Sequence, residues 1–254
     1  MTQECALVTG ATSGIGWEVA CALAERGAVV GLLGRRRDRA EALAAKLREL
    51  GGDGIALPAD VGDPRQVEAA VSKLVGLTGR LDTVVANAGV ALTGTVIDMT
   101  EEEWSRIMRC NLDGTFYTAR FTMPHLLASK GTFTAIASDA GLQGAVGYAA
   151  YCASKHAVVG FVRCLALDHG PQGVRSNVVC PGWVETPMAE ELLAAASKPE
   201  LAFYRASVPL GRFARPQEVA KAVLHLSSAE ATFANGMTYS IDGGSTAGYF
   251  FAPA

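Results

Sequence analysis

The sequence lacks the cysteine and histidine patterns of metal sites and disulfide frameworks. Its six cysteines form no Cys-x-x-Cys motif, and its four histidines are dispersed along 254 residues. Several cysteines fall within predicted strands or helices. We therefore predict no metal site, and we expect the thiols to be reduced and buried.

The sequence also lacks an excess of basic residues, because its formal net charge is -3. Nucleic acid and anionic membrane surfaces are therefore not expected as partners. No apolar run reaches the length of a membrane span, and residues 1–4 carry no basic segment of a signal peptide. On these grounds we expect a cytoplasmic protein without a membrane partner.

No low-complexity segment, internal repeat or shift in composition marks a domain boundary. Half of the residues (50%) are hydrophobic, which is enough for one large core. Apolar runs typical of strands alternate with helical patterns throughout the chain. This alternation predicts an α/β fold in which residues 1–254 form a single domain around a doubly wound parallel sheet, with ligands at the carboxyl ends of the strands.

A glycine-rich turn follows the first predicted strand, residues 6–8, and precedes a helical pattern over residues 17–26. From Thr9 to Gly16 it reads Thr-Gly-Ala-Thr-Ser-Gly-Ile-Gly. Glycines let the backbone approach a diphosphate closely, and a helix N-terminus supplies free N–H groups for it. The alternative is that the glycines only shape a tight turn, since their spacing departs from the commoner Gly-x-Gly-x-x-Gly.

The second predicted strand ends at Gly34 and is followed by Arg35, Arg36 and Arg37. In dinucleotide-binding folds an acidic residue at this strand end binds the ribose 2′-hydroxyl, whereas arginine accommodates a 2′-phosphate. Guanidinium groups suit phosphate in geometry and charge. The sequence therefore favours NADP over NAD, unless these arginines only begin the exposed helix that follows.

Polar residues also follow the next two predicted strands. Asp60 comes after the strand over residues 55–59, where its carboxylate would accept from an adenine amino group or cap its own turn. Asn87 comes after the strand over residues 81–86. We expect both side chains at the ligand-binding edge of the sheet.

A helix is predicted over residues 100–127, and it begins with a capping box at Thr100. Asn111 lies in its interior. Because asparagine is a poor helix former, this position calls for a functional or a kink-related explanation.

Tyr151 and Lys155 stand four residues apart at the start of a predicted helix, so their side chains share one face. A neighbouring ammonium stabilises a phenolate. We therefore expect Lys155 to lower the pKa of Tyr151 and the pair to act as a general acid/base. Ser138 ends a predicted buried strand, residues 133–137, and would bring its hydroxyl to the same site. A Tyr-x-x-x-Lys match alone is weak, because it arises by chance.

Taken in order, these stretches resemble the short-chain dehydrogenase/reductase family across nearly the whole chain. The residues that carry the resemblance are Thr9, Gly10, Gly14–Gly16, Asp60, Asn87–Gly89, Asn111, Ser138, Tyr151, Lys155, Pro181, Gly182 and Thr186. The resemblance implies a seven-stranded Rossmann-like sheet with strand order 3-2-1-4-5-6-7 and a homotetramer. It also implies hydride transfer between NADP, or alternatively NAD, and a ketone or secondary alcohol.

The resemblance also implies roles for individual residues. Tyr151 would donate the proton to the carbonyl and Ser138 would polarise the substrate oxygen. Lys155 would hold the nicotinamide ribose, and Asn111 would hold a water of a proton relay. The residues expected to bind the cofactor are Gly10, Thr12, Ser13, Ile15, Gly16, Gly34, Arg35, Arg36, Asp60, Val61, Asn87, Ala88, Gly89, Tyr151, Lys155, Pro181, Gly182, Val184 and Thr186.

Two departures from the family pattern matter, at Ala86 and Asp139, and a further pair of residues bears on the substrate. Ala86 replaces a usual asparagine, which should leave the role of Asn87 intact. Asp139 follows Ser138 and would disfavour anionic substrate groups if it faces inward. Gln172 and Gly173 stand where ketoacyl-carrier-protein reductases of the family tend to have a basic residue. We therefore favour a free ketone or alcohol over a carrier-protein substrate.

The walls of the substrate pocket are expected to be apolar and to suit a hydrophobic or cyclic ketone. The candidate wall residues, each of which would also serve as ordinary core, are Leu142, Val146, Tyr148, Trp183, Met188 and Leu192. A lid is predicted at about residues 184–212. The apolar end of the chain, residues 247–254, is expected to pack at a subunit interface.

Other functions on this fold remain open. The nearest are an NAD-linked alcohol dehydrogenase and a 3-oxoacyl reductase. A non-catalytic dinucleotide sensor would be expected to have lost Tyr151 or Lys155, and both are present. An epimerase or dehydratase that retains its cofactor would usually carry an extra substrate domain.

Overall fold

A single parallel sheet organises the chain in the computed structural model, which describes residues 3–194 and 196–250. In this part of the chain seven strands pair in the order β3-β2-β1-β4-β5-β6-β7. This confirms the fold class and strand order expected from the sequence. The strands are β1 (Cys5–Thr9), β2 (Val29–Gly34), β3 (Asp53–Pro58), β4 (Thr83–Ala86), β5 (Thr132–Ile136), β6 (Arg175–Pro181) and β7 (Thr238–Ile241).

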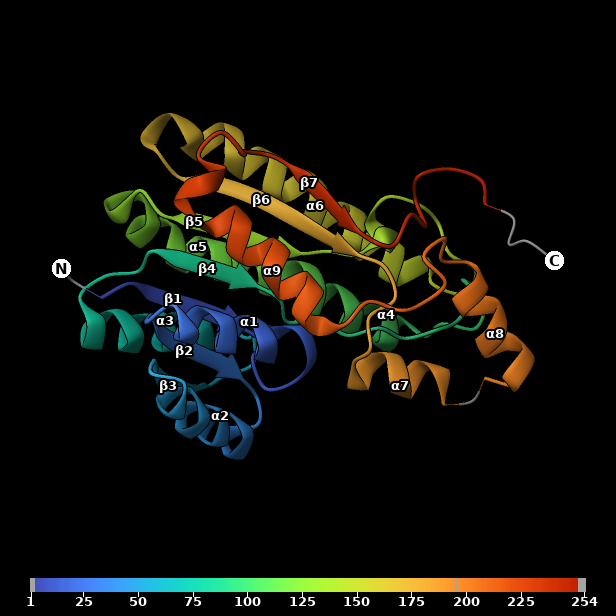
Figure 1. Cartoon of the computed structure of the whole chain (residues 1–254), viewed down its shortest axis with the longest axis horizontal. Helices are drawn as coiled ribbons and strands as arrows, with labels where there is room; N and C mark the ends of the chain where they lie inside the picture. Colours follow the sequence, from blue (N-terminus) through green and yellow to red (C-terminus); the bar gives the residue numbers. More distant parts are fainter. Residues whose placement is uncertain (1–2, 195, 251–254) are drawn as a thin grey trace.

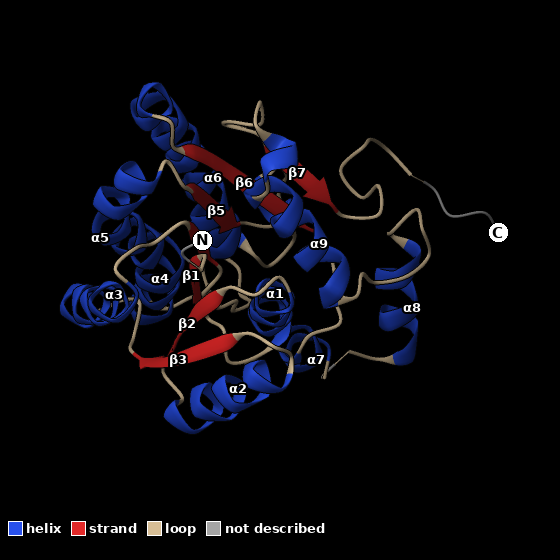
Figure 2. Cartoon of the chain, turned by 60° about the vertical axis from the view of Figure 1, so that its left-hand side comes forward, coloured by secondary structure: helices blue, strands red, loops and turns tan. Residues whose placement is uncertain are grey.

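Helices cover both faces of this sheet (Figure 2). One face carries α1 (Gly14–Glu25), α2 (Arg37–Glu49) and α9 (Pro216–Ser227), and the other carries α3 (Pro64–Thr78), α4 (Glu101–Met108), α5 (Gly114–Ser129) and α6 (Ala149–His169). Every residue of β1, β4 and β5 is buried. Strands covered on both sides need apolar residues on both faces, which is why their sequences are continuous apolar runs rather than alternating ones.

Two further helices lie beyond the carboxyl ends of the strands, α7 (Pro187–Leu193) and α8 (Lys198–Ala206) (Figure 1). They fall within the predicted lid. Trp183 ties this region to the body of the protein, because its ring lies 5.2 Å from that of Tyr204 and 5.6 Å from that of Phe213, between centroids. A lid motion of this segment stays a prediction.

The helix predicted over residues 100–127 is interrupted. The capping box at Thr100 is present, since its hydroxyl accepts from the Glu103 N–H and the Glu103 carboxylate accepts from the Thr100 N–H. The helix then widens into a π-helix over Arg109–Asp113 before α5 begins. Asn111 lies in this widened turn, which supports the kink-related explanation for an asparagine at that position.

The strand register brings the ends of β1, β4, β5 and β6 to one edge of the sheet. Val8 is aligned with Val85, Ala86 with Ala135, and Ile136 with Val179. Residues that follow these strands therefore lie side by side, although they are far apart in sequence. This edge carries the candidate site.

The expectation that the thiols are buried needs correction. All six cysteines are free thiols, but Cys21 and Cys110 are only partly buried and Cys164 is exposed. Tyr249 near the end of the chain is 100% exposed in the single chain, residues 251–254 lie outside the described residues, and packing of this segment at a subunit interface stays a prediction. Within residues 3–194 and 196–250, no helix is long and apolar enough to cross a membrane, and no cluster of three His, Cys, Asp or Glu side chains could hold a metal ion.

Candidate active site

The turn between β1 and α1 presents the N-terminus of α1 to a cavity. Gly10 and Gly14 have φ angles of 64° and 56°, which favour glycine. Ser13 is the N-cap residue but makes no capping bond with its side chain, and the first turn contains no acidic residue. The first N–H groups of the helix therefore remain available to an anion such as a diphosphate.

Gly16 lies beneath this turn and allows α1 to pack against it. A Cβ at Gly16 would lie 2.4 Å from the Gly10 oxygen and 2.5 Å from Asn87 Nδ2. Any side chain would push these groups apart, so the glycine is required by packing rather than by contact with the cavity.

Asn87 fastens the end of β4 to the same turn. Its Nδ2 donates to the carbonyl oxygens of Thr9 and Gly10 at 3.0 and 3.2 Å. The Thr9 hydroxyl accepts in return from the N–H groups of Asn87 and Ala88 at 3.0 and 3.1 Å. These bonds fix the shape of the glycine turn, and none of them involves the side chain of Ala86.

Arginines surround the next part of the cavity, at the end of β2. Arg36 folds over the turn, with Nη2 donating to Thr12 Oγ1 at 3.0 Å and to Ser13 Oγ at 3.1 Å. Arg35 lines the cavity beside it. The segment Gly34–Arg37, which ends β2 and begins α2, contains no acidic residue, and the next acid in the chain is Asp38 in the first turn of α2. The arrangement is suited to a phosphate group.

Asp60 stabilises its own turn at the end of β3. Its Oδ1 accepts from the Gly62 N–H at 2.9 Å, and its Oδ2 lies 3.5 Å from Arg109 Nη2. The capping alternative for this residue is therefore observed. A contact with adenine stays a prediction.

Lys155 is 4% exposed and directs its ammonium toward the end of β5. Its Nζ donates to the main-chain oxygen of Ile136 at 2.9 Å and lies 5.6 Å from the centroid of the Tyr151 ring. Burial lowers the pKa of Lys155 to about 8.

The pKa of Tyr151 is raised rather than lowered, which corrects the expectation from the sequence. Burial of the phenol is the largest cause, and it outweighs the influence of the nearby Ser138 hydroxyl, which acts in the opposite direction. The Lys155 ammonium is bonded to Ile136 rather than to the phenol. Spacing along a helix predicted the shared face of Tyr151 and Lys155 but not the cost of desolvating the phenolate.

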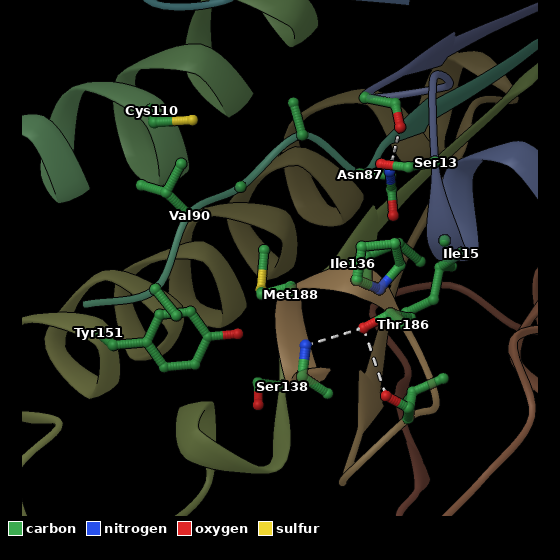
Figure 3. A pocket seen from close by; sticks show the side chains of 18 of the residues that line it. Ser13, Ile15, Asn87, Val90, Cys110, Ile136, Ser138, Tyr151, Thr186 and Met188 are labelled. Atoms are coloured by element: carbon green, nitrogen blue, oxygen red, sulfur yellow. Dashed lines mark hydrogen bonds between the residues drawn. The ribbon is translucent and has the colours of Figure 1, made fainter. Parts of the chain in front are cut away.

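Ser138 follows β5 and faces the same cavity as Tyr151 (Figure 3). Its Oγ accepts from the Ala140 N–H at 3.2 Å, which caps the 3-10 helix Asp139–Gly141, and donates to Asp139 Oδ1 at 2.8 Å. Asp139 is also among the residues that line the cavity. Burial raises the pKa of its carboxyl.

Asn111 lies behind the cavity wall and is 1% exposed. Its Nδ2 donates to the Val90 oxygen and to Ser154 Oγ, both at 3.0 Å, and its Oδ1 accepts from the Val90 N–H at 2.8 Å. The main-chain oxygen of Asn111 accepts from the Thr115 hydroxyl at 2.7 Å. The side chain therefore joins the π-helix, the loop after β4 and α6, and its role in a proton relay stays a prediction.

These elements enclose a cavity of about 590 Å³ along the carboxyl edge of the sheet. Of the site residues predicted from sequence, all except Gly16 and Asn111 line it. Of the predicted substrate walls, Tyr148, Trp183, Met188 and Leu192 line it. Leu142 packs against the core instead, and Val146 is 99% exposed.

Sequence reasoning missed Arg106, Arg109 and Cys110 in the cavity wall. These residues lie at the end of α4 and in the π-helix. The two arginines stand three residues apart, a spacing that places them on one helical face. The spacing could have indicated that the two arginines share one face of the helix. Their place in the cavity wall depends on how α4 packs over the strand ends, which the spacing does not encode.

Comparisons with known proteins agree with this geometry. A family model described as Enoyl-(Acyl carrier protein) reductase matches residues 10–246. The chain is 37% identical to meso-2,3-butanediol dehydrogenase of Serratia marcescens over 241 residues, which are 95% of this chain and 94% of that protein. It is 34% identical to 3-oxoacyl-(acyl-carrier-protein) reductase FabG of Thermotoga maritima over 239 residues, which are 94% and 96% of the two chains.

The fold also agrees with a solved structure, that of a short-chain type dehydrogenase/reductase from Mycobacterium marinum. The two superpose with a TM-score of 0.89 at 35% identity, over 96% of this chain and 95% of the other. Fold, site and relatives together define an oxidoreductase that acts on CH–OH groups with a nicotinamide cofactor. The chain belongs to the short-chain dehydrogenase/reductase family.

Proposed function

We propose that this enzyme is an NADP-dependent carbonyl reductase, reversible as an alcohol dehydrogenase, for a small hydrophobic or cyclic ketone. The observation that carries the cofactor preference is the end of β2, where Arg35 lines the cavity and Arg36 bonds to Thr12 and Ser13. The chain has no acidic residue directly after β2, where NAD-binding folds use one to bind the ribose 2′-hydroxyl. NAD remains the alternative.

The residues present fit a dinucleotide. The uncapped N-terminus of α1 suits the diphosphate, and Gly10 keeps the backbone open toward it. Arg35 and Arg36 suit a 2′-phosphate on the adenosine side. Val184 and Thr186, after β6, suit the carboxamide end of the nicotinamide. When bound, the nicotinamide supplies the hydride.

The side chains of this enzyme then supply the proton that the reduced carbonyl oxygen needs. Tyr151 has a raised pKa and stays protonated at neutral pH, so it is suited to donate a proton to a carbonyl oxygen that has gained negative charge. Ser138 holds that oxygen, and the Lys155 ammonium lies close to the phenol and stabilises its anionic form. Asn111 positions the loop after β4, which borders the same space.

The apolar walls support a compact, uncharged substrate. Tyr148, Trp183, Met188 and Leu192 line the cavity. Asp139 lines the same cavity, and its carboxyl would disfavour anionic groups near the reacting carbon whenever it is ionised. The Serratia marcescens relative is named for a small diol, which is consistent with a free alcohol or ketone.

A 3-oxoacyl reductase is the second candidate, because the Thermotoga maritima relative carries that name. Gln172 and Gly173 offer no positive charge to an acidic carrier protein. A carrier-linked substrate is therefore the weaker proposal, and reduction of acetoacetyl thioesters tests it directly.

The oligomeric state and the lid belong to the same proposal. Trp104 on α4 and Phe116 on α5 are 45% and 40% exposed, which supports a homotetramer that covers them. Size-exclusion chromatography with light scattering tests this expectation. The segment over residues 184–212, which holds α7 and α8, is proposed to close over bound substrate.

The function is tested with acetoin, cyclohexanone and acetophenone, and with the corresponding alcohols, by following nicotinamide absorbance with NADPH and NADH. Wild type should reduce at least one ketone, with NADPH preferred. Tyr151→Phe should lose most of that turnover while retaining cofactor binding. Retained turnover in this variant would remove Tyr151 from its assigned role.

A further inference from the structure

Asp139 holds the only hydroxyl hydrogen of Ser138. Ser138 Oγ donates to Asp139 Oδ1 at 2.8 Å, and the Ala140 N–H donates to the same oxygen at 2.8 Å. Both side chains belong to one turn of backbone at the start of the 3-10 helix, so they are held in register. While this hydrogen is given to Asp139, it is not available to a substrate oxygen.

Ser138, Asp139 and Tyr151 all line the same cavity, so the serine hydroxyl stands between its bond to Asp139 and the space in front of the phenol. While an ionised Asp139 accepts the serine hydrogen, Ser138 presents only lone pairs toward the cavity. A carbonyl oxygen accepts hydrogen bonds and does not donate them. An ionised Asp139 therefore competes with a ketone for the same hydrogen.

We propose that Asp139 is a positioning residue for Ser138, and that it releases the serine hydroxyl toward a substrate carbonyl only when its own carboxyl carries a proton. A protonated carboxyl donates to Ser138 Oγ, which leaves the serine hydrogen for the ketone. This inference rests on the role of Ser138 in the proposed function. It makes carbonyl reduction favourable at pH values below the pKa of Asp139.

The surroundings of Asp139 favour the protonated form of its carboxyl. Burial is the largest cause that raises its pKa, and it outweighs the bonds from Ser138 and the Ala140 N–H, which act in the opposite direction. Asp242, after β7, raises the pKa further. From α6 the neutral phenol of Tyr151 faces it, while the Lys155 ammonium is directed to Ile136. From β6 the thiol of Cys180 faces it, with a pKa raised by burial to about 11, and so brings no charge at neutral pH.

A carboxyl titration tests the contact without any turnover. Carbon-13 NMR of the aspartate carboxyls, with Asp139→Asn to assign the resonance, should give Asp139 a pKa above its ordinary 3.8. Ser138→Ala should raise that pKa further, because it removes a bond that favours the carboxylate. An ordinary value, or the same value in both proteins, would overturn the proposal.

The pH profile of kcat/KM for reduction of acetoin with NADPH tests the consequence. Wild type should show a limb that falls as pH rises through the titrated pKa of Asp139. Asp139→Asn should lack this limb, because its amide donates to Ser138 at every pH, and Asp139→Ala should lack it because no acceptor remains. Above that pKa the kcat/KM of both variants should be about ten-fold higher than that of wild type. This factor corresponds to the free energy of one hydrogen bond to a charged group.

The control is Asp168→Asn, which removes an exposed carboxylate near the end of α6 and should keep the wild-type profile. If both Asp139 variants melt like wild type but keep its falling limb, or are slower at every pH, the proposal is wrong. If wild type reduces no ketone, or Tyr151→Phe stays active, the proposed function has failed instead. The carboxyl titration then still decides whether Asp139 and Ser138 are coupled.

Discussion

The Lys155 ammonium donates to the main-chain oxygen of Ile136 at 2.9 Å, and this bond joins α6 to the carboxyl end of β5. It places a buried cation directly beside the strand that leads to Ser138. Burial lowers the pKa of Lys155 to about 8, so the charge of the site changes within an accessible pH range. The buried ammonium is therefore both a structural link between α6 and β5 and the origin of a pH dependence.

Activity that depends on the Lys155 charge should decline above about pH 8. Lys155→Met should lower kcat/KM by roughly 100-fold, within the range for a group that assists proton transfer. Lys221→Met, which removes an exposed ammonium on α9, should behave like wild type. Steady-state reduction rates between pH 6 and pH 10, on the order of two units either side of the Lys155 pKa, provide the measurement. A wild-type profile that stays flat through this range would contradict the assignment.

The stability of the folded protein should change in the opposite direction over the same range. Between about pH 8 and the ordinary lysine pKa of 10.5, the unfolded chain binds a proton at Lys155 that the folded protein does not. The unfolding free energy of wild type should therefore rise relative to that of Lys155→Met by up to about 1.4 kcal/mol per pH unit. Urea denaturation of both proteins at pH values in this window measures the difference.

Cofactor preference should depend on Arg35 and Arg36 but not on Arg37. Replacing Arg35 with Asp places a carboxylate where the 2′-phosphate is proposed, and should lower the ratio of kcat/KM for NADPH over NADH by about ten-fold or more. Arg36→Ala should also weaken both cofactors, because Arg36 holds Thr12 and Ser13. Arg37→Ala is the control, since Arg37 pairs with Glu41 on the surface of α2. Unchanged ratios in the first two variants would favour an NAD-linked enzyme.

Much of the fold could be predicted because the signals were local. Apolar runs buried on both faces of a sheet differ plainly from helical patterns, and glycine turns, Asn87 and Ser138 follow the strands directly. The order of the strands came from the family resemblance, because pairing between distant segments leaves little trace in one sequence.

What could not be predicted depends on packing between distant elements. The π-helix at Arg109–Asp113 interrupts a pattern that looks continuous in sequence. The raised pKa of Tyr151 comes from desolvation by residues of several elements, which no spacing encodes. Val146 was predicted to line the substrate pocket because it is apolar, but it is exposed to solvent.

Gly16 should tolerate no side chain. In Gly16→Ala the new Cβ would meet the Gly10 oxygen at 2.4 Å and Asn87 Nδ2 at 2.5 Å, and so distort the turn proposed to bind the diphosphate. We expect NADPH affinity, measured by fluorescence titration, to fall by about ten-fold or more. Gly76→Ala is the matched control, because Gly76 lies within α3 with nothing within 4 Å of the added Cβ. That control should stabilise the protein by about 0.5–1 kcal/mol and leave affinity unchanged.

Asn111 should matter for stability as well as for activity. In Asn111→Ala the N–H and C=O of Val90 and the Ser154 hydroxyl lose a buried partner, which should lower the unfolding free energy by about 2–4 kcal/mol. Asn111→Asp keeps the bond from the Val90 N–H but removes both donors, so it should also destabilise the protein, and more so at pH values where the carboxylate is ionised. Urea denaturation of the two variants, followed by circular dichroism, provides the test. If Asn111→Ala unfolds at the same urea concentration as wild type while losing turnover, the residue acts in catalysis rather than as the clamp between the π-helix, the loop after β4 and α6.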